Sequence, residues 1–411
     1  MYVAILNNKF LTFVIAIGLM TVLSIGLRKR SSAVRAMLFS QAPAFAVAFY
    51  VLALLVSDYA NVWDLIACGL FELLILCIYL RLFVNLIDCA SALNPHAVTR
   101  MLYVSTAMQV ITIWPLLTSV GFGIFSEGSR VAYLYDSSLA KYLTYTQVIT
   151  GAVQAGLLAS RINSQNGIGL LGLAVVLINF GSSLASGSKG AVFLWLAAIL
   201  SLVSFKVLKA RPVWLTLSLL ICVSGLVVTA YFVGSVLGLT MAEFAELALS
   251  RFFLVNDARA LAVDLRGFTN GVDFFSEAFR SLGNMLSLSP QNQNLGSFLY
   301  DTYFGPSGGS GANASLTALI TAYSQPGMAF LPALLFSCIL AFSAIAIRDI
   351  RRNMQVVSDK YIVTIMSMNL LLLFSQDFLA FQVALPLSFV IAPILMFSGR
   401  GFVRESRNAI A

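Results

Sequence analysis

The sequence predicts an all-α integral membrane protein with about eleven transmembrane helices, in a range of about ten to twelve. Three observations predict this class. Charged residues are scarce, apolar runs reach the length of a membrane-spanning helix, and basic residues gather in alternate loops. Hydrophobic residues make up 59% of the 411 residues and charged residues only 10%. A soluble domain has about 25% charged residues, so lipid must surround much of this chain.

The apolar runs are predicted to be helices rather than barrel strands. They are about 20 residues long and lack the two-residue alternation of a barrel strand. The first run has no leading basic region and no small-residue cleavage site, so we expect a retained helix. The predicted spans are residues 9–27, 36–56, 62–80, 101–124, 144–160, 168–185, 190–206, 213–239, 324–347, 361–378 and 379–398.

Basic residues set the predicted orientation, because cytoplasmic loops are enriched in Lys and Arg. Placing the loop with Arg28, Lys29, Arg30 and Arg35 inside puts 17 of the 25 basic residues, and the C-terminus, in the cytoplasm. The formal net charge of +8 is mostly this bias, so nucleic-acid binding is not expected. The basic residues left outside are Lys9, Arg130, Lys141, Lys189, Arg251, Arg259, Arg266 and Arg280.

Two outer segments interrupt the apolar pattern. One is the loop 125–143, and the other is the stretch 240–323, the only long polar region of the chain. The second is far longer than an ordinary connection, which indicates functional content. The chain therefore divides into helices one to eight (1–239), a large outer loop (240–323), and the remaining helices with the C-terminus (324–411).

An arginine stripe is the main candidate site in the large loop. The segment 243–265 has the pattern of an amphipathic helix, on which Arg251, Arg259 and Arg266 fall within roughly 80° of one another. Asp257 and Asp264 fall on the opposite side. One guanidinium group can donate two parallel hydrogen bonds to phosphate oxygens, so the stripe predicts an anion site. Salt bridges with Glu246, Asp257 or Asp264 are the structural alternative.

Two further outer segments carry polar groups suited to an anionic ligand. Lys189 lies in the tight Gly/Ser turn 186–190, where backbone N–H groups and a helix start favour anions. Arg130 is an isolated cation in the first outer loop. The glycine-rich stretch 305–315 precedes a helical pattern at 314–323, with Asn313 as the expected N-cap. This stretch is either a closing loop, with Asp301 and Tyr303 at its edge, or a plain linker.

Other side chains limit the chemistry. The only histidine, His96, falls in a predicted inner loop, so histidine catalysis outside is not expected. No outer carboxylates have the local spacing of a metal site, and no cofactor is predicted. Glu72 is a charge inside an apolar run and thus a functional candidate, with Arg81 or a polar cavity as the structural alternative. The cysteines Cys68, Cys77, Cys89, Cys222 and Cys338 are expected to be small core residues.

The run 179–191, NFGSSLASGSKGA, resembles the TGSRG-type hairpin of bacterial O-antigen polymerases and ligases, with Lys189 where that family more often has arginine. Ser129-Arg130 with its nearby tyrosines, and the long arginine-bearing loop, also resemble polymerases of the Wzy type. The Asn313-Ala314-Ser315 stretch ahead of Pro326-Gly327 fits their general pattern. The resemblance covers most of the chain as architecture and is sharp over only a few dozen residues.

This resemblance implies a GT-C-like fold in the bacterial inner membrane, with an active site that faces the periplasm. It implies a glycosyltransferase that polymerises undecaprenyl-diphosphate-linked oligosaccharides, with membrane lipids and a chain-length regulator as further partners. The leaving diphosphate would be stabilised by cations. The residues implied to bind diphosphate or glycan are Arg130, Lys189, Arg251, Arg259, Arg266, Arg280, Tyr303 and Asn313. The candidate proton acceptors are Asp257, Asp301 and Glu127.

Two alternatives stay open. An O-antigen ligase of the same superfamily would carry a histidine in the large outer loop, and this chain has none there. A lipid-linked oligosaccharide flippase or transporter would have repeated halves and buried charges near the bilayer midplane. The sequence instead has no internal repeat and concentrates its polar residues in one outer region. Polymerase is therefore the favoured expectation.

Overall fold

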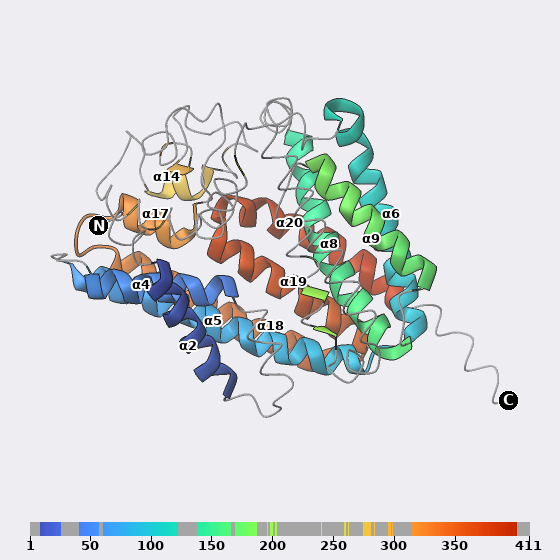
Figure 1. The fold of residues 1–411 in the computed structure, drawn as a ribbon, viewed down its shortest axis with the longest axis horizontal. Coiled ribbons are helices and arrows are strands. Elements are labelled where there is room, and N and C mark those ends of the chain that lie inside the picture. The colour runs from blue at the N-terminus through green and yellow to red at the C-terminus, as the bar shows by residue number, and fades with distance from the viewer. Residues whose placement is uncertain are drawn as a thin grey trace. The chain divides into compact units, whose positions relative to one another are not determined.

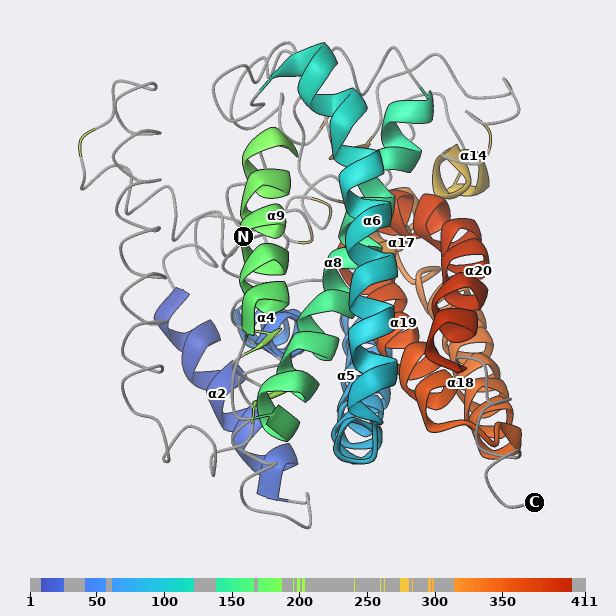
Figure 2. The same cartoon turned by 90° about the vertical axis from the view of Figure 1, so that its right-hand side faces the viewer.

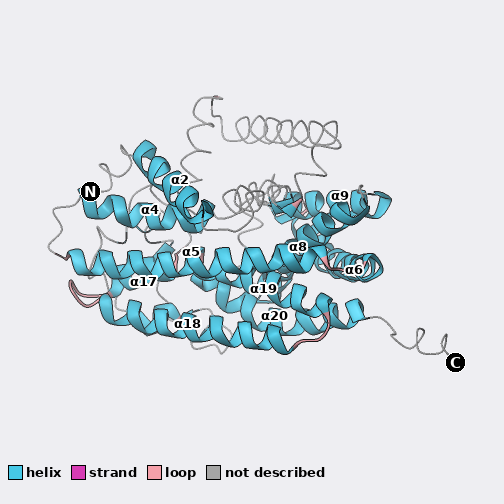
Figure 3. Cartoon of the chain, turned by 90° about the horizontal axis from the view of Figure 1, so that it is seen from below, coloured by secondary structure: helices cyan, strands magenta, loops and turns pink. Residues whose placement is uncertain are grey.

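The computed structural model describes residues 9–25, 41–56, 61–121, 138–165, 169–186 and 314–400, with short pieces at 195, 198–199, 202–203, 240, 259, 262, 274–280, 283, 295–296 and 298. Within these residues the regular secondary structure is helical and contains no strand (Figure 3). The predicted helical class is thereby confirmed.

The described helices overlap the predicted apolar runs, and Figure 1 shows where they lie along the chain. They are α2 (Lys9–Ile25), α4 (Gln41–Val56), α5 (Val62–Ser91), α6 (Pro95–Val120), α8 (Ser138–Gln165), α9 (Gly169–Ser186), α14 (Phe274–Ala278), α17 (Leu316–Tyr323), α18 (Phe330–Asn353), α19 (Val357–Gln376) and α20 (Phe378–Arg400). The predicted span 213–239, and most of 190–206, lie outside the described residues. The predicted total of eleven thus stays a prediction.

Five of the described helices are long and apolar enough to cross a membrane, by length and composition: α5, α6, α18, α19 and α20. Shorter apolar stretches occur in α2, α4 and α9. This set of apolar helices is that of a multi-pass membrane protein.

Helix α6 begins earlier than its hydropathy predicts. The Asn94 side chain accepts a hydrogen bond from the His96 N–H at 2.9 Å, and Pro95 occupies the first helical position. Both features are favourable at a helix start, because the first N–H groups lack partners within the helix. His96 therefore lies in the first turn of α6 and not in a loop, and its side chain is exposed.

The chain divides into two compact units. The first contains residues 1–81, 227–345 and 370–383, and the second contains residues 82–226, 346–369 and 384–411. Residues of the long polar region thus belong to the same unit as α2, α4 and the first two thirds of α5.

In the first unit, α2 packs against α4, and α17 lies along α5. Cys68 of α5 faces Thr321 of α17, with 3.8 Å between Sγ and Oγ1. Four residues before Cys68, the Asp64 carboxylate accepts a 2.7 Å hydrogen bond from the Gly327 N–H, just beyond the end of α17. Gly327 has a φ of 85°, a conformation that favours glycine. These contacts make α17 antiparallel to α5.

In the second unit, α6, α8 and α9 lie side by side (Figure 2). Exposed positions in the middle of these helices are apolar: Ile111 and Trp114 of α6 are 69% and 66% exposed, and Leu177 of α9 is 61% exposed. Amide side chains such as Gln109 and Asn179 are buried. A soluble protein has the opposite distribution, so this pattern supports a lipid environment.

Candidate functional site

Glu72 is the buried charge around which the candidate site is built. It lies ten residues after the first residue of α5, about 15 Å along the helix axis. Its side chain is 0% exposed. A carboxylate without solvent is strongly destabilised unless it is paired and hydrogen-bonded, so its partners define the site.

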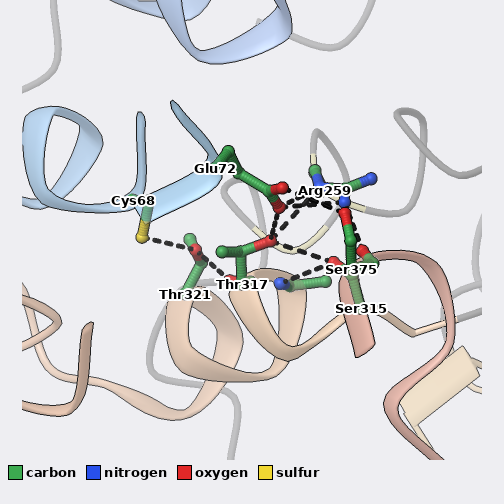
Figure 4. A network of polar contacts seen from close by, with 8 residues as sticks. Cys68, Glu72, Arg259, Ser315, Thr317, Thr321 and Ser375 are labelled. Carbon is green, nitrogen blue, oxygen red and sulfur yellow. Dashed lines mark hydrogen bonds and ion pairs between the residues drawn. The ribbon is translucent and has the colours of Figure 1, made fainter. Parts of the chain in front are cut away.

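Arg259 is the cationic partner of Glu72 (Figure 4). Its Nη2 and Nε donate to Glu72 Oε1 at 2.9 and 3.2 Å. The arginine is 1% exposed. Arg259, in the long polar region, is therefore bound to α5, 187 positions earlier in the sequence.

The start of α17 supplies hydroxyl groups to this pair. Thr317 Oγ1 donates to Glu72 Oε1 at 2.7 Å and accepts from Arg259 Nε at 3.2 Å. Ser315 is the N-cap, and its Oγ accepts from the Ala318 N–H at 3.1 Å. Ser315 Oγ also lies 3.0 Å from Thr317 Oγ1. The helix start thus places two hydroxyls beside the buried ion pair.

The end of α19 completes the cluster. Ser375 Oγ donates to Glu72 Oε2 at 3.1 Å, and the Ser375 carbonyl accepts from Arg259 Nη2 at 2.6 Å. Ser375 lies two residues before Asp377, the single residue that joins α19 to α20. At the same turn, the Phe378 N–H donates to the Ala314 carbonyl at 3.0 Å. The site therefore lies at the tip of a helical hairpin.

An aromatic group of side chains borders this polar cluster. Phe71 precedes Glu72 and contacts Phe374, with 6.0 Å between ring centroids. Phe374 in turn contacts Phe378 and Phe381 at 5.5 and 5.1 Å. These rings keep the dielectric low around the Glu72–Arg259 pair, which strengthens its charge-assisted hydrogen bonds.

A second buried ion pair lies in the same unit. Arg280 Nε donates to Glu277 Oε2 at 2.7 Å, and Glu277 Oε1 accepts from the Leu295 N–H at 2.8 Å. Both side chains are buried. Burial and the nearby Glu277 carboxylate raise the pKa of Tyr323, at the end of α17. Gln382 Nε2 also donates to the Ala278 carbonyl, so α14 is anchored to α20.

The two arginines of the predicted anion site that the structure describes are both ion-paired. Arg259 was expected on an outward-facing stripe, and it is instead buried against Glu72, because α5 carries a carboxylate that needs a partner. Arg280 belongs to the separate Glu277 pair. The other predicted site residues lie outside the described part of the chain; they are Glu127, Arg130, Lys189, Arg251, Asp257, Arg266, Asp301, Tyr303 and Asn313.

Two details of the sequence interpretation change. The N-cap of α17 is Ser315 rather than Asn313, because the helix begins at Leu316. The partner of Glu72 is Arg259 rather than Arg81, whose side chain is exposed. The roles of Thr317 and Ser375 were not predicted. The sequence contained a signal for Thr317. Cys68 and Glu72 are four residues apart, and so are Thr317 and Thr321, which is the spacing that lets two antiparallel helices pair these residues.

The cluster is suited to positioning rather than to proton transfer. Both carboxylate oxygens of Glu72 accept hydrogen bonds, and the Arg259 fork donates to Glu72, Thr317 and Ser375. Across the residues that the structure describes, no three His, Cys, Asp or Glu side chains are grouped as metal ligands would be. The cluster therefore fixes Arg259, a residue of the long polar region, at the hairpin tip.

The Ser315 cap gives a first prediction. Ser315→Ala should lower the free energy of unfolding by about 1 kcal/mol, because the Ala318 N–H loses its acceptor at the helix start. Thermal unfolding of the purified protein in detergent measures this loss. The matched control is Ser91→Ala, which removes an exposed side-chain bond to a backbone carbonyl and should change stability by less than half as much. Equal losses of stability in the two variants would show that the Ser315 cap stabilises the protein no more than an exposed side-chain hydrogen bond does.

Comparison with known proteins gives no relative: no known family, no curated protein and no solved structure matches the chain significantly.

Proposed function

We propose that the chain is a glycosyltransferase that joins undecaprenyl-diphosphate-linked oligosaccharide repeat units into a surface polysaccharide, in the manner of a Wzy-type polymerase. The observation that carries the proposal is the attachment of the arginine-bearing region to the hairpin tip through Arg259 and Glu72. The opposite ends of α19 and α20 carry Lys360 and Arg400, which the positive-inside rule assigns to the cytoplasm. The hairpin tip then faces the periplasm.

In this proposal, the bond between the anomeric carbon of the growing glycan and its diphosphate breaks, and the electron pair goes to the diphosphate oxygen. A hydroxyl of the incoming repeat unit forms the new glycosidic bond and gives its proton to a carboxylate. Fixed cations stabilise the charge that develops on the diphosphate. Candidate carboxylates for the proton are Asp257, Asp301 and Glu127.

The geometry divides the arginines into two roles. Arg259 and Arg280 already donate to buried carboxylates, so we assign them to positioning. Direct contact with the diphosphate falls to Arg130, Lys189, Arg251 and Arg266. Arg251 and Arg266 are eight and seven positions from Arg259 along the sequence.

The test is incubation of the purified protein in liposomes with a defined lipid-diphosphate repeat unit, followed by product sizing. The proposal expects a ladder of multimers. A single unchanged repeat would contradict it, and transfer only onto lipid A-core would indicate a ligase.

Reporter fusions within residues 240–313 should report a periplasmic location. A cytosolic location would remove the basis for an anion site, because the inside bias would explain those arginines.

A flippase of the same lipid-linked oligosaccharide is the second candidate, and one observation favours it. The short helix α17 is buried along most of its length and starts beside an ion pair. In transporters, the ends of interrupted helices form substrate and ion sites. The same liposome experiment separates the two functions, because a flippase moves the lipid-linked unit across the bilayer without joining units.

A further inference from the structure

The second unit contains a buried set of polar side chains that the proposed reaction does not use. We call it the amide network; its members are Thr106 and Gln109 of α6, Gln147 and Gln154 of α8, and Asn179 and Ser182 of α9. Gln109, Gln147, Gln154, Asn179 and Ser182 are all buried. Helix α8 is long enough to span a membrane, yet its polar content keeps it outside the five apolar spans.

Hydrogen bonds connect the three helices at two levels. At one level, Gln109 Nε2 donates to Asn179 Oδ1 at 3.0 Å, and Asn179 Nδ2 donates to Gln154 Oε1 at 2.6 Å. Gln154 Nε2 then donates to Thr106 Oγ1 at 3.3 Å. At the other level, Ser182 Oγ donates to Gln147 Oε1 at 2.8 Å. Gln147 and Gln154 are seven residues apart, so they lie on one face of α8.

Two atoms of the network have no hydrogen-bond partner among the described residues. They are Gln109 Oε1, an acceptor, and Gln147 Nε2, a donor. An unsatisfied buried polar atom costs about 1–3 kcal/mol. A network that served only helix packing would have no use for these two atoms, since an apolar side chain would pack as well without the penalty.

The chemistry of the network identifies the kind of ligand. Each member is neutral, so the network offers no charge to a phosphate or a metal ion. A free acceptor and a free donor are the groups to which hydroxyl groups bind, because a hydroxyl both donates and accepts. Gly151 lies on the same face of α8, and its lack of a side chain lets Asn179 approach closely, because a Cβ there would begin only 3.2 Å from Asn179 Oδ1.

We propose that the amide network binds hydroxyl groups of a neutral carbohydrate, through Gln109 Oε1 and Gln147 Nε2. The proposal rests on the proposed function only for the source of that carbohydrate, the lipid-linked repeat unit. The network is then a glycan subsite in the second unit, formed by residues other than the cations that would hold the diphosphate.

The test uses the oligosaccharide released by mild acid from the host's own lipid carrier and labelled with tritium. Its equilibrium binding to the full-length protein in nanodiscs is compared between variants. Gln147→Met removes the free donor at nearly constant volume and should weaken binding about tenfold. Thr118→Val is the control outside the network. It removes an exposed side-chain bond to the Trp114 carbonyl of α6, and it should change binding by no more than about twofold.

Thermal unfolding of both variants guards against a trivial loss of fold. Gln109→Leu removes the free acceptor and replaces Gln147→Met as the test variant, with the same Thr118→Val control, should Gln147→Met prove unstable. Equal affinities in all variants, or an ordered water as the only occupant of the network, would overturn the proposal. A liposome assay without multimers, combined with Gln147-dependent binding, would reject the polymerase and keep the subsite. If Gln147→Met produced multimers at the wild-type rate and bound the oligosaccharide as tightly as the wild type, the polymerase would be kept and the subsite rejected.

Discussion

Replacing Arg259 by alanine should lower the free energy of unfolding by about 3–5 kcal/mol, because it leaves the Glu72 carboxylate buried without its cation. Glu72→Gln should have a loss of similar size, since it leaves the buried guanidinium unpaired. The double variant Glu72→Leu with Arg259→Met should be more stable than either single variant, because it removes both desolvated charges together. Unfolding in detergent, followed by far-UV circular dichroism, measures all three.

The matched control is the exposed pair formed by Arg348 and Asp349, whose side chains are 41% and 52% exposed. Arg348→Ala should change stability by less than about 1 kcal/mol. If Arg348→Ala and Arg259→Ala lowered the free energy of unfolding by similar amounts, burial would not explain the loss in Arg259→Ala.

The same variants separate positioning from direct contact. Arg259→Ala should abolish the polysaccharide ladder above one repeat, and Arg251→Ala should do the same, with each protein still in the membrane. Because Arg259 acts by positioning, the stable double variant should recover part of the ladder. A stable double variant without any ladder would instead place the guanidinium in contact with substrate. Arg259→Lys should give a result between alanine and wild type, since Lys has no planar fork for Glu72 and Ser375.

The second large effect is a pH dependence at the hairpin turn. Burial raises the pKa of Asp377 to about 6, from an ordinary value of 3.8, although N–H groups of Ala380 and Leu379 partly oppose the rise. A raised pKa means that folding favours the protonated form. The stability from Asp377 is then complete below pH of about 4 and is lost as pH rises through about 6. The total loss is at most about 3 kcal/mol.

Asp377→Asn isolates this effect. Asparagine is also a good helix N-cap, so it keeps an acceptor for the Ala380 N–H, which now bonds Asp377 Oδ1 at 2.9 Å. The variant and the wild type should unfold at the same temperature at pH 4. At pH 8 the variant should be more stable. A constant difference between the two proteins across this range would contradict a raised pKa.

Helix positions were predictable because hydropathy is a local property. The predicted spans 9–27 and 168–185 match α2 and α9 to within two residues at each end. The start of α6 was missed because capping chemistry at Asn94 and Pro95 extends the helix beyond its apolar run. Helix α17 was predicted from its pattern, with an error of two residues at its start.

The partner of Glu72 could not be predicted from the local sequence pattern. Glu72 in an apolar run indicates that some partner exists, but the choice of Arg259 over Arg81 depends on packing between segments 187 residues apart. The amide network left a clearer signal. Gln147, Thr150 and Gln154 repeat at helical spacing within one predicted span, which marks a polar face on a membrane helix.

The sequence distances within the Glu72 cluster have a consequence for biogenesis. Ser375 is 303 residues downstream of Glu72, and Thr317 is 245 residues downstream. At about 5–20 residues per second of synthesis, the ribosome needs roughly 15–60 seconds after Glu72 to reach Ser375. Helix α5 must therefore enter the bilayer with an unmatched acid, and the rest of its strongly apolar sequence has to drive that insertion. The cluster is complete only at a late, post-insertion step, once the hairpin that carries Ser375 has been made, whereas Arg259 is made earlier, 187 residues after Glu72.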